Sequence, residues 1–449
     1  MSALDPLRHA LGADAVVTDP DVLETYRQDR ALTPDAGWPL ALLRPSSTDQ
    51  VRTVMRWAND SGTPVVTRGA GTGLSGAAAA VDGCVVLSTA RMQQLRIDTG
   101  DLIAVVGPGV VNSQLKAAAR EHGLTYPPDP SSYEECTIGG NIATNAGGLC
   151  CVKYGVTRDY VLGLEVVLAD GRVMALGGRT VKNVAGFDLL GLFVGSEGTL
   201  GVVTQATLRL RPLPPAPATL VASFGDLAAA GRAVSTIVRG ATMSAVELMD
   251  QAAVQAVERY RPMGLDPGVE CLLIAQSDSG LSDVVAAERV CEEHGADFTA
   301  VTDDRAEGEM FMAGRRAAIP ALFEEGRLLV EDVAVPLSRI ADLLSEVRRV
   351  ARETDTTIAT VGHAGDGNFH PLICFDPSDE DATKRAYQAF DEVMRAALAL
   401  GGTITGEHGV GTLKKALFRE QVDPVALGIS RELKALLDPH GILNPGVVL

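Results

Sequence analysis

The spacing of apolar and polar residues predicts a chain that contains both helices and strands. Residues 47–58 carry apolar side chains at i, i+3, i+4 and i+7, from Val51 to Ala58, which predicts an amphipathic helix. Ser47 and Gln50 fit a capping box at its start. Short apolar runs predict strands at residues 65–67, 84–88, 103–106, 164–168 and 202–210. The first part of the chain is therefore expected to be a glycine-rich α+β domain.

A proline-rich segment marks the best domain boundary. Residues 211–217 hold four prolines in seven positions, a composition that sustains neither a helix nor a strand ladder. The expected domains are residues 1–212 and 213–449.

Strand and helix patterns alternate after this boundary. The first set has strand-like runs at 219–224, 270–275 and 298–302 and helical runs between them at 226–239 and 282–293. The second set follows the same alternation, with a helix near Arg315, a strand at 328–335, a helix from Ser338 and a strand at 357–361. Two β-α-β units predict a ferredoxin-like antiparallel sheet. A last helical region is expected at residues 382–399.

Charge and composition narrow the functional classes. The chain has 449 residues, 46 % of them apolar, and a net charge of −18, which repels nucleic-acid backbones. An anionic substrate would therefore need a local basic residue. The seven cysteines show no iron–sulfur or zinc spacing. Neither a signal peptide nor an uninterrupted apolar run of about 18 residues is present, so we expect a cytoplasmic protein without a transmembrane segment.

Three glycine-rich loops are suited to a large ligand. The first, residues 68–76, has four glycines among its last eight positions and follows a predicted strand, so its backbone N–H groups can surround an anion such as a pyrophosphate. The others are residues 137–148, preceded by Pro127-Pro-Asp-Pro-Ser-Ser132, and residues 195–201. Small residues let a flat ring system lie against the backbone.

These loops form an ordered set: R-G-x-G-T-G, P-D-P-S, I-G-G-N-x-x-x-N-A-G-G, K-Y-G and G-S-E-G-T-L-G. Over nearly the whole chain the set resembles the FAD-linked oxidases of the vanillyl-alcohol oxidase and p-cresol methylhydroxylase superfamily. The resemblance implies an α+β fold, with a two-subdomain FAD-binding domain of the p-cresol methylhydroxylase type, a ferredoxin-like α+β substrate domain and a C-terminal helical segment that contacts FAD.

The same resemblance implies the FAD contacts. The pyrophosphate cradle would be Arg68, Gly69, Ala70, Gly71, Thr72, Gly73, Leu74 and Ser75. The isoalloxazine would meet Pro128, Asp129, Thr137, Gly140, Asn141, Thr144, Gly147 and Gly148, and the adenine side Glu197, Gly201 and Val202. Ser132 is expected to offer the cofactor a further hydrogen bond. Because residues 68–76 contain no histidine or cysteine, FAD is expected to be noncovalent.

Two histidines flank a Gly-Asp-Gly turn. A hairpin centred between Asp366 and Gly367 would make His363 and His370 cross-strand neighbours, close enough to share a metal ion. Asn368 would share their face of the strand and could touch the same substrate. His408 lies beside Glu407 in a second glycine-flanked segment, and two imidazoles with one carboxylate are a common catalytic metal set.

The motifs G-H-x-G-D-G-N-x-H, G-E-H-G-V-G and D-P-x-G-I-L-N-P-G resemble one branch of the superfamily: glycolate oxidase flavin subunits, D-lactate dehydrogenases and D-2-hydroxyglutarate dehydrogenases. This resemblance implies that His363, His370 and Glu407 bind a divalent metal, with zinc expected. His408 would be the catalytic base and Asn444 would face the flavin. The metal would lower the pKa of a substrate hydroxyl while FAD accepts hydride.

Substrate choice is expected to depend on two further positions. Arg315 resembles the family arginine that clamps the substrate carboxylate. The hydroxyglutarate dehydrogenases carry a lysine where this chain has Val330, which favours a monocarboxylate such as D-lactate or glycolate over D-2-hydroxyglutarate.

Several functional classes remain open. The chain could be a D-2-hydroxyglutarate dehydrogenase or a flavin subunit of a multi-subunit glycolate oxidase, and an alditol oxidase or an ether-lipid synthase would share the FAD domain. An external acceptor is expected, namely a quinone, a cytochrome, a flavoprotein or oxygen. A homodimer and a complex peripheral to the inner membrane both stay open.

Overall fold

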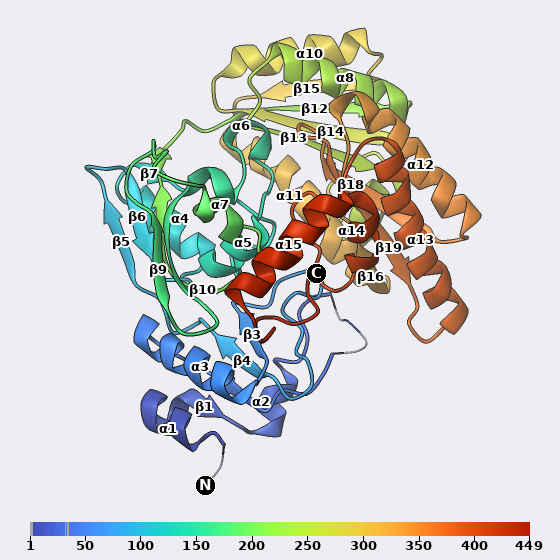
Figure 1. Ribbon diagram of the computed structural model, residues 1–449. Helices are drawn as coiled ribbons and strands as arrows, with labels where there is room; N and C mark the ends of the chain where they lie inside the picture. The colour runs from blue at the N-terminus through green and yellow to red at the C-terminus, as the bar shows by residue number, and fades with distance from the viewer. Residues whose placement is uncertain (1–2, 32, 34–35) are drawn as a thin grey trace. The chain divides into compact units, whose positions relative to one another are not determined.

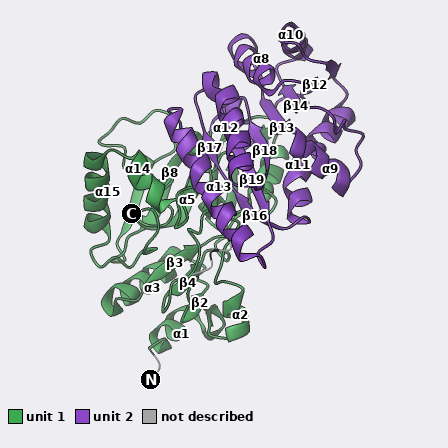
Figure 2. Cartoon of the chain, turned by 90° about the vertical axis from the view of Figure 1, so that its right-hand side faces the viewer, with its two compact units in different colours: residues 1–147, 156–213, 407–449 green, residues 148–155, 214–406 purple. Residues whose placement is uncertain are grey.

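The computed structural model describes residues 3–31, 33 and 36–449, and these divide into two compact units (Figure 2). Unit 1 comprises residues 1–147, 156–213 and 407–449, and unit 2 comprises residues 148–155 and 214–406. One division between the units falls inside the proline-rich segment. The segment 407–449 belongs to unit 1, although residues 214–406 of unit 2 separate it from the rest of that unit in sequence.

The N-terminal part of unit 1 is a four-stranded sheet of order β1–β2–β4–β3 (Figure 1). Its strands are β1 (Val16–Val17), β2 (Ala41–Leu43), β4 (Val85–Ser88) and β3 (Val65–Arg68), and both β2 and β3 run parallel to β4. Helix α3 (Thr48–Ser61) begins after Ser47, whose hydroxyl accepts the N–H of Gln50, and it buries Val51, Val54, Met55 and Ala58. The helix predicted from the spacing of these four residues is confirmed.

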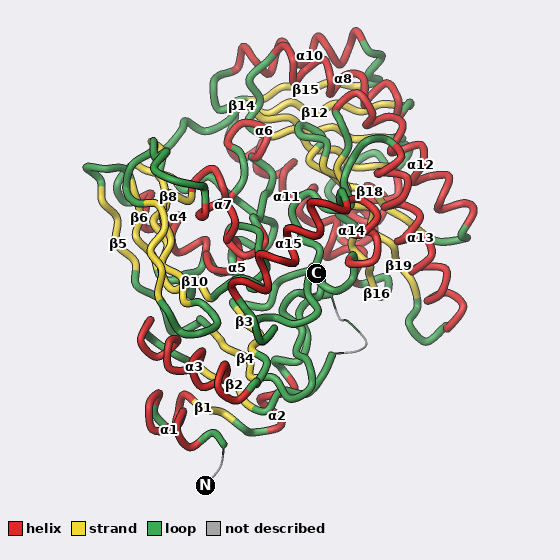
Figure 3. The backbone as a smooth tube through the Cα atoms, in the orientation of Figure 1, coloured by secondary structure: helices red, strands yellow, loops and turns green. Residues whose placement is uncertain are grey.

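A second sheet of unit 1 is antiparallel throughout, with order β5–β6–β10–β8–β9. It comprises β5 (Leu95–Asp98), β6 (Ile103–Val106), β10 (Val202–Arg209), β8 (Val161–Val167) and β9 (Val173–Gly177). The other elements of unit 1 are short or peripheral: α1 (Asp5–Leu11), α2 (Pro20–Glu24), α4 (Asn112–Arg120), β7 (Leu124–Thr125), α5 (Ile138–Thr144), α7 (Leu189–Phe193), β11 (Arg211–Pro212), α14 (Lys415–Gln421) and α15 (Pro424–Leu437). Figure 3 shows how much of this unit is loop.

Unit 2 is built on an eight-stranded antiparallel sheet. Along the path β15–β12–β14–β13–β18–β19–β16, with β17 also paired to β19, the strands are β15 (Phe298–Thr302), β12 (Ala218–Phe224), β14 (Cys271–Ser277), β13 (Ala245–Asp250), β18 (Thr357–His363), β19 (Asn368–Phe375), β16 (Arg327–Val330) and β17 (Val333–Ala334). In chain order the first four strands have the arrangement 4-1-3-2 of a ferredoxin-like unit, and the second set extends the same sheet. The predicted ferredoxin-like antiparallel sheet is confirmed.

The helices of unit 2 form two groups. Helices α8 (Leu227–Gly240), α10 (Leu281–Glu293), α12 (Ile340–Glu353) and α13 (Glu380–Ala399) pack against one another in sequence α10–α8–α12–α13, whereas α9 (Gln251–Tyr260) packs on α11 (Arg305–Phe323). The short helix α6 (Cys151–Tyr154) joins this unit because Lys153 and Tyr154 both bond to the carboxylate of Asp278. No helix among the described residues combines the length and the apolar character that crossing a membrane requires.

Candidate active site

The first glycine-rich loop leaves β3 of unit 1 and runs over residues 69–76. The backbone N–H groups of Gly69 to Ser75 make no hydrogen bond to any residue that the structure describes. Seven consecutive unpaired donors are unusual in a partly buried segment, because backbone N–H groups are normally satisfied. Such a row of donors suits a polyanion.

Arg68 underlies this loop. Its Nη1 donates to the carbonyl of Ala78 at 3.2 Å, and Asp29 accepts the N–H of the same residue at 3.2 Å. A Cβ on Gly71, where φ is +75°, would lie 2.1 Å from Nη2 of Arg68. The guanidinium therefore fixes the shape of the loop and places a cation beneath it, although burial lowers its pKa.

The C-terminal segment of unit 1 lies against the same loop. The hydroxyl of Ser75 donates to the carbonyl of His408 at 3.1 Å, and the carbonyl of Ser75 accepts the N–H of Thr412 at 3.0 Å. Leu443 forms a parallel bridge with Val65 in β3. Residues far apart in sequence are thus held together around the end of β3.

Glu197 and Asn444 tie the third glycine-rich loop to this assembly. The carboxylate oxygens of Glu197 accept the N–H groups of Val410 and Gly411, each at 2.8 Å. The amide nitrogen of Asn444 donates to the carbonyls of Ala77 at 2.8 Å and Glu197 at 2.7 Å. Burial raises the pKa of Glu197 to about 7, although the two backbone donors oppose the shift.

The middle loop uses its polar side chains within unit 1. Asn141 bonds to Asn112 and Cys136, and Thr137 caps helix α5 by accepting the N–H of Gly140 at 3.3 Å. The hydroxyl of Thr144 donates to the carbonyl of Gly140. Any contact of these three side chains with a flavin would compete with these bonds, so the backbone of the loop is the better candidate surface.

The remaining residues predicted to contact FAD lie in the segment 128–132, at the start of β10 and at the boundary between residues 147 and 148. The carbonyl of Pro128 accepts the amide of Asn112, and Asp129 is the next residue. The carbonyl of Ser132 accepts two backbone N–H groups. Gly201 packs so tightly that a Cβ would lie 2.6 Å from Val166, and Val202 is fully buried in β10. Gly147 ends the first segment of unit 1, and Gly148 begins the first segment of unit 2.

The predicted histidine hairpin exists in unit 2, but its register was wrong. The loop spans residues 364–367 and is closed by the N–H groups of Asp366 and Gly367, which both bond to the carbonyl of His363. His363 therefore pairs with Asn368, while His370 pairs with Val361. The turn centre lies one residue earlier than predicted because Gly367 takes the positive φ of +82° at the end of the loop.

The two histidines nevertheless lie close together. Their ring centroids are 5.2 Å apart, and one ring nitrogen of each lies within 4.8 Å of the other. Nδ1 of His363 lies 2.8 Å from Oε1 of Glu247, and Nδ1 of His370 lies 3.2 Å from the carbonyl of Glu331. An imidazole whose Nδ1 donates its proton carries its lone pair on Nε2, the atom that can bind a metal.

Arg315 reaches the same carboxylate from helix α11. Its Nε lies 2.9 Å from Oε2 of Glu247, and both side chains are buried, with 6 % and 0 % of their surface exposed. Within the described ranges, no residue hydrogen-bonds to the two terminal nitrogens of Arg315. A buried guanidinium with an unpaired fork can bind a carboxylate through two parallel hydrogen bonds.

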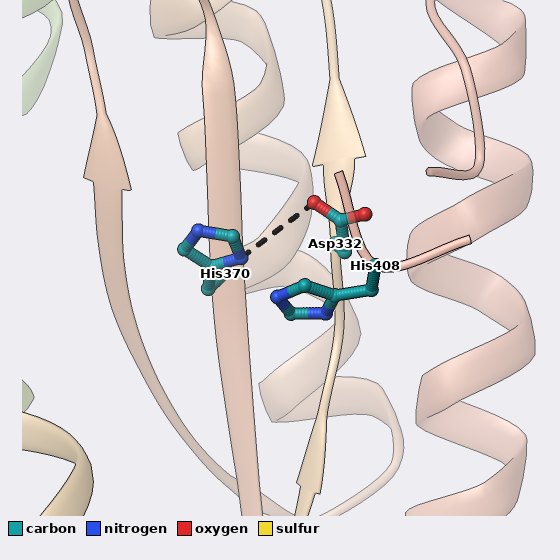
Figure 4. A group of neighbouring side chains, drawn as sticks. All are labelled: Asp332, His370 and His408. Carbon is teal, nitrogen blue, oxygen red and sulfur yellow. Dashed lines mark ion pairs between the residues drawn. The ribbon is translucent and has the colours of Figure 1, made fainter. Parts of the chain in front are cut away.

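Asp332 is a second buried carboxylate beside the histidines. Figure 4 shows its ion pair with His370, where Nδ1 and Oδ1 are 3.7 Å apart. It also accepts the amide of Asn368 at 2.8 Å, the hydroxyl of Thr405 at 2.7 Å and the N–H of Gly406 at 2.9 Å. Asp332 therefore holds the loop that precedes Glu407, and the amide nitrogen of Asn368 is occupied by its bonds to Asp332 and to the carbonyl of Val333.

Glu247 and Asp332 are the residues that sequence reasoning missed. Each interrupts an apolar run, Ala245-Val-Glu-Leu-Met249 and Leu328-Leu-Val-Glu-Asp-Val333. A carboxylate inside such a run is costly to bury unless it is paired. That interruption was the available signal for both residues.

Two family models and several known proteins match this chain. Residues 213–448 match the family described as FAD linked oxidases, C-terminal domain, and residues 39–177 match the family described as FAD binding domain. The glycolate oxidase subunit GlcD of Bacillus subtilis is 40 % identical over 415 residues, which cover 91 % of this chain and 88 % of that protein. D-lactate dehydrogenase of Archaeoglobus fulgidus is 36 % identical over 435 residues, covering 95 % and 96 %.

Solved structures support the fold. Substrate-bound p-cresol methylhydroxylase superposes with a TM-score of 0.83 at 20 % identity, covering 99 % of this chain and 95 % of that one. The isoeugenol complex of 4-ethylphenol oxidase from Gulosibacter chungangensis gives 0.81 at 20 % identity, covering 99 % and 96 %. The predicted fold class and superfamily are confirmed.

Proposed function

This chain belongs to the FAD-linked oxidases, and from that premise we propose that it oxidises a small D-2-hydroxy acid, D-lactate or glycolate, to the 2-oxo acid. FAD is its cofactor and serves as the hydride acceptor. The unpaired N–H groups of Gly69 to Ser75 and the cation of Arg68 fit its pyrophosphate. Asn444 and Glu197 would act by holding the loops that surround it.

The observation that carries the substrate class is the buried cluster of unit 2. His363, one of two neighbouring histidines suited to a metal, and Arg315, a buried arginine with an unpaired fork, both contact the carboxylate of Glu247. A 2-hydroxy acid has the matching chemistry, because its hydroxyl and its carboxylate stand on adjacent carbons. Arg315 would bind the carboxylate, and Asn368 would border the same site.

His363, His370 and Glu407 are proposed to hold a divalent metal, with zinc preferred for this donor set. Chain connectivity supports Glu407 as the third ligand, since it directly follows Gly406, whose N–H is held by Asp332 beside His370. A divalent cation there would lower the pKa of the substrate hydroxyl. His408, the next residue, would accept the hydroxyl proton.

Val330 supports a monocarboxylate. It pairs directly with Leu372, two residues from His370 in β19, so its side chain shares the face of the sheet that carries the histidine. An apolar, buried residue there offers no counter-ion to a second carboxylate. D-2-hydroxyglutarate should therefore be a poor substrate.

The electron acceptor is proposed to be external. The seven cysteines are all free, and their spacing matches no iron–sulfur motif, which supports an acceptor outside this chain. A quinone, a cytochrome, a flavoprotein or oxygen would reoxidise the flavin, either alone with this chain or within a larger glycolate oxidase.

The proposal is tested by anaerobic bleaching of the flavin absorbance with D-lactate, L-lactate, glycolate and D-2-hydroxyglutarate, each with and without chelator. D-lactate or glycolate should bleach the flavin with a kcat/KM at least about 10-fold above that of D-2-hydroxyglutarate, as expected for a lost charge pair. Chelator should suppress bleaching, and added zinc should restore it. Bleaching by none of the four acids, or a preference for D-2-hydroxyglutarate, would contradict the proposal.

A further inference from the structure

Glu247 is placed by the sheet rather than by a loop. It lies in β13, directly opposite His363 of β18, and its side chain has no exposed surface. Directly opposite residues on neighbouring antiparallel strands bring their side chains close together on one face. The pairing of β13 with β18 thus fixes the distance between this carboxylate and the imidazole.

The two oxygens of Glu247 have different partners. Oε1 lies 2.8 Å from Nδ1 of His363, and Oε2 lies 2.9 Å from Nε of Arg315. A buried carboxylate is costly unless it is paired, and Arg315 supplies a permanent positive charge. An apolar residue at 247 would fill the strand at lower cost, so the retained carboxylate is better explained by the groups it holds than by the stability of the sheet.

One oxygen controls the chemistry of His363. A carboxylate only accepts hydrogen bonds, so the imidazole donates from Nδ1 and keeps its lone pair on Nε2. Carboxylate–histidine pairs of this kind orient a metal-binding ring and raise its basicity. Loss of the carboxylate would leave both the tautomer and the ring rotation unset.

The other oxygen controls the direction of Arg315. Glu247 contacts Nε, so its charge holds the guanidinium while the two terminal nitrogens have no hydrogen-bond partner among the described residues. The contact joins the two charges without the alignment of a hydrogen bond. The orientation of the guanidinium therefore depends on the charge of Glu247 more than on its hydrogen-bonding capacity.

We propose that Glu247 is a positioning residue that sets the spacing between the metal-binding His363 and the carboxylate-binding Arg315, and thereby fits the site to acids with a hydroxyl on the carbon next to the carboxylate. This inference rests on the proposed function. A 3-hydroxy acid separates the two groups by one more carbon and would not span the same spacing.

The test uses the holoenzyme and three substitutions at one position. Glu247→Gln keeps an oxygen for His363, so its zinc dissociation constant should stay within about 3-fold of wild type. The same variant loses the negative charge that faces Arg315, so KM for D-lactate should rise by about 10-fold or more, while kcat at saturation changes less. Glu247→Ala loses both contacts, and its zinc dissociation constant should rise by about 10- to 100-fold. Glu247→Asp retracts the carboxylate by one methylene and supplies the metal measurement if the alanine variant does not fold.

Asp250→Asn is the matched control. Asp250 is a buried carboxylate of the same strand that accepts the backbone N–H groups of Ala253 and Thr360, and it has no bond to His363 or Arg315. It should lower thermal stability while leaving zinc affinity and KM unchanged. Equal losses in Asp250→Asn and the Glu247 variants would show a general loosening of β13 against β18 and would overturn the inference.

Selectivity and wild-type behaviour separate the two proposals. The ratio of kcat/KM for D-lactate over D-3-hydroxybutyrate should fall in Glu247→Asp. If wild type binds zinc and oxidises D-lactate but the Glu247 variants match it in zinc affinity and KM, only this inference fails. If wild type does neither, the proposed function fails.

Discussion

At the scale of single residues, Glu197 illustrates what a motif does not reveal. The run G-S-E-G-T-L-G predicts a residue on the adenine side of FAD, yet both carboxylate oxygens bind backbone N–H groups of Val410 and Gly411. These partners lie beyond the whole of unit 2 in sequence, so no local pattern could identify them. The carboxylate therefore joins two loops of unit 1.

The raised pKa of Glu197 gives a pH prediction. The pKa of Glu197 in the folded protein, about 7, exceeds its ordinary value of 4.5, so the native state binds the proton more tightly than the unfolded state. Proton binding by Glu197 therefore stabilises the native state. This stabilisation is fully present below pH 4.5 and is lost as the pH rises through about 7. Over that window the contribution should amount to about 3 kcal/mol at most. Thermal unfolding from pH 5 to 8 should show a decline in wild type that Glu197→Gln lacks.

The relevant quantity is the difference between wild type and Glu197→Gln at each pH, because other groups titrate in the same range. A difference that stays constant from pH 5 to 8 would show that Glu197 does not titrate in this window.

The face of the histidine hairpin could be predicted from the sequence, but its register could not. The symmetry of His363 and His370 about Gly-Asp-Gly predicted that the two rings share a face, and they do. The register could not be predicted, because glycines at 365 and 367 allow several loop lengths. A shift of two residues kept both side chains on the same face, since the strand period is two.

At the scale of elements, helices and strands with a clear sequence pattern were predicted correctly, and those without one were not. Helix α3 was predicted within a few residues because a helical period dominates it, and strands β6 and β15 were predicted with their observed bounds from short strand-like runs. Strand β13 and helix α9 were missed. All six residues of β13 are buried, so the strand shows no alternation of apolar and polar residues. Its two acidic residues, Glu247 and Asp250, are also atypical of a buried strand.

The glycine-rich loop gives an element-level prediction. Gly71→Ala places a Cβ 2.1 Å from Arg68 at a position with φ of +75°, so the loop must shift and its N–H groups lose their common direction. FAD affinity, measured by titrating FAD into the deflavinated protein, should fall by at least about 10-fold, as expected when several hydrogen bonds of about 1 kcal/mol each are weakened.

Gly62→Ala is the control for backbone strain. Gly62 ends α3 with φ of +68°, and nothing lies within 4 Å of its added Cβ. It should cost about 1 to 2 kcal/mol of stability and leave FAD affinity unchanged. Equal affinity loss in both variants would mean that a general loss of stability, and not a displaced cradle, lowers the affinity for FAD.

At the scale of the whole molecule, we predict that FAD is bound noncovalently. The cradle segment 68–76 contains no histidine or cysteine to form a covalent bond with the flavin. Acid precipitation of the purified protein should therefore leave a colourless pellet and release the yellow flavin into the supernatant. A pellet that stays yellow after washing would establish a covalent link elsewhere in the chain.

The path of the chain between the units was the least predictable feature. One division between the units lies within the proline-rich segment, but composition gave no sign that residues 407–449 join unit 1 or that residues 148–155 join unit 2. Both memberships depend on long-range contacts such as Leu443 with Val65 and Lys153 with Asp278.

The pairing of Leu443 and Asn444 with β3 has a consequence for biosynthesis. A ribosome completes residues 214–406 before it makes the segment that bridges to Val65 and bonds to Ala77 and Glu197. Unit 2 therefore has its full set of residues first, although unit 1 begins earlier. If residues 68–76 bind FAD as proposed, flavin capture by a finished cradle has to wait until translation has passed residue 444, and by then all of unit 2 has been made.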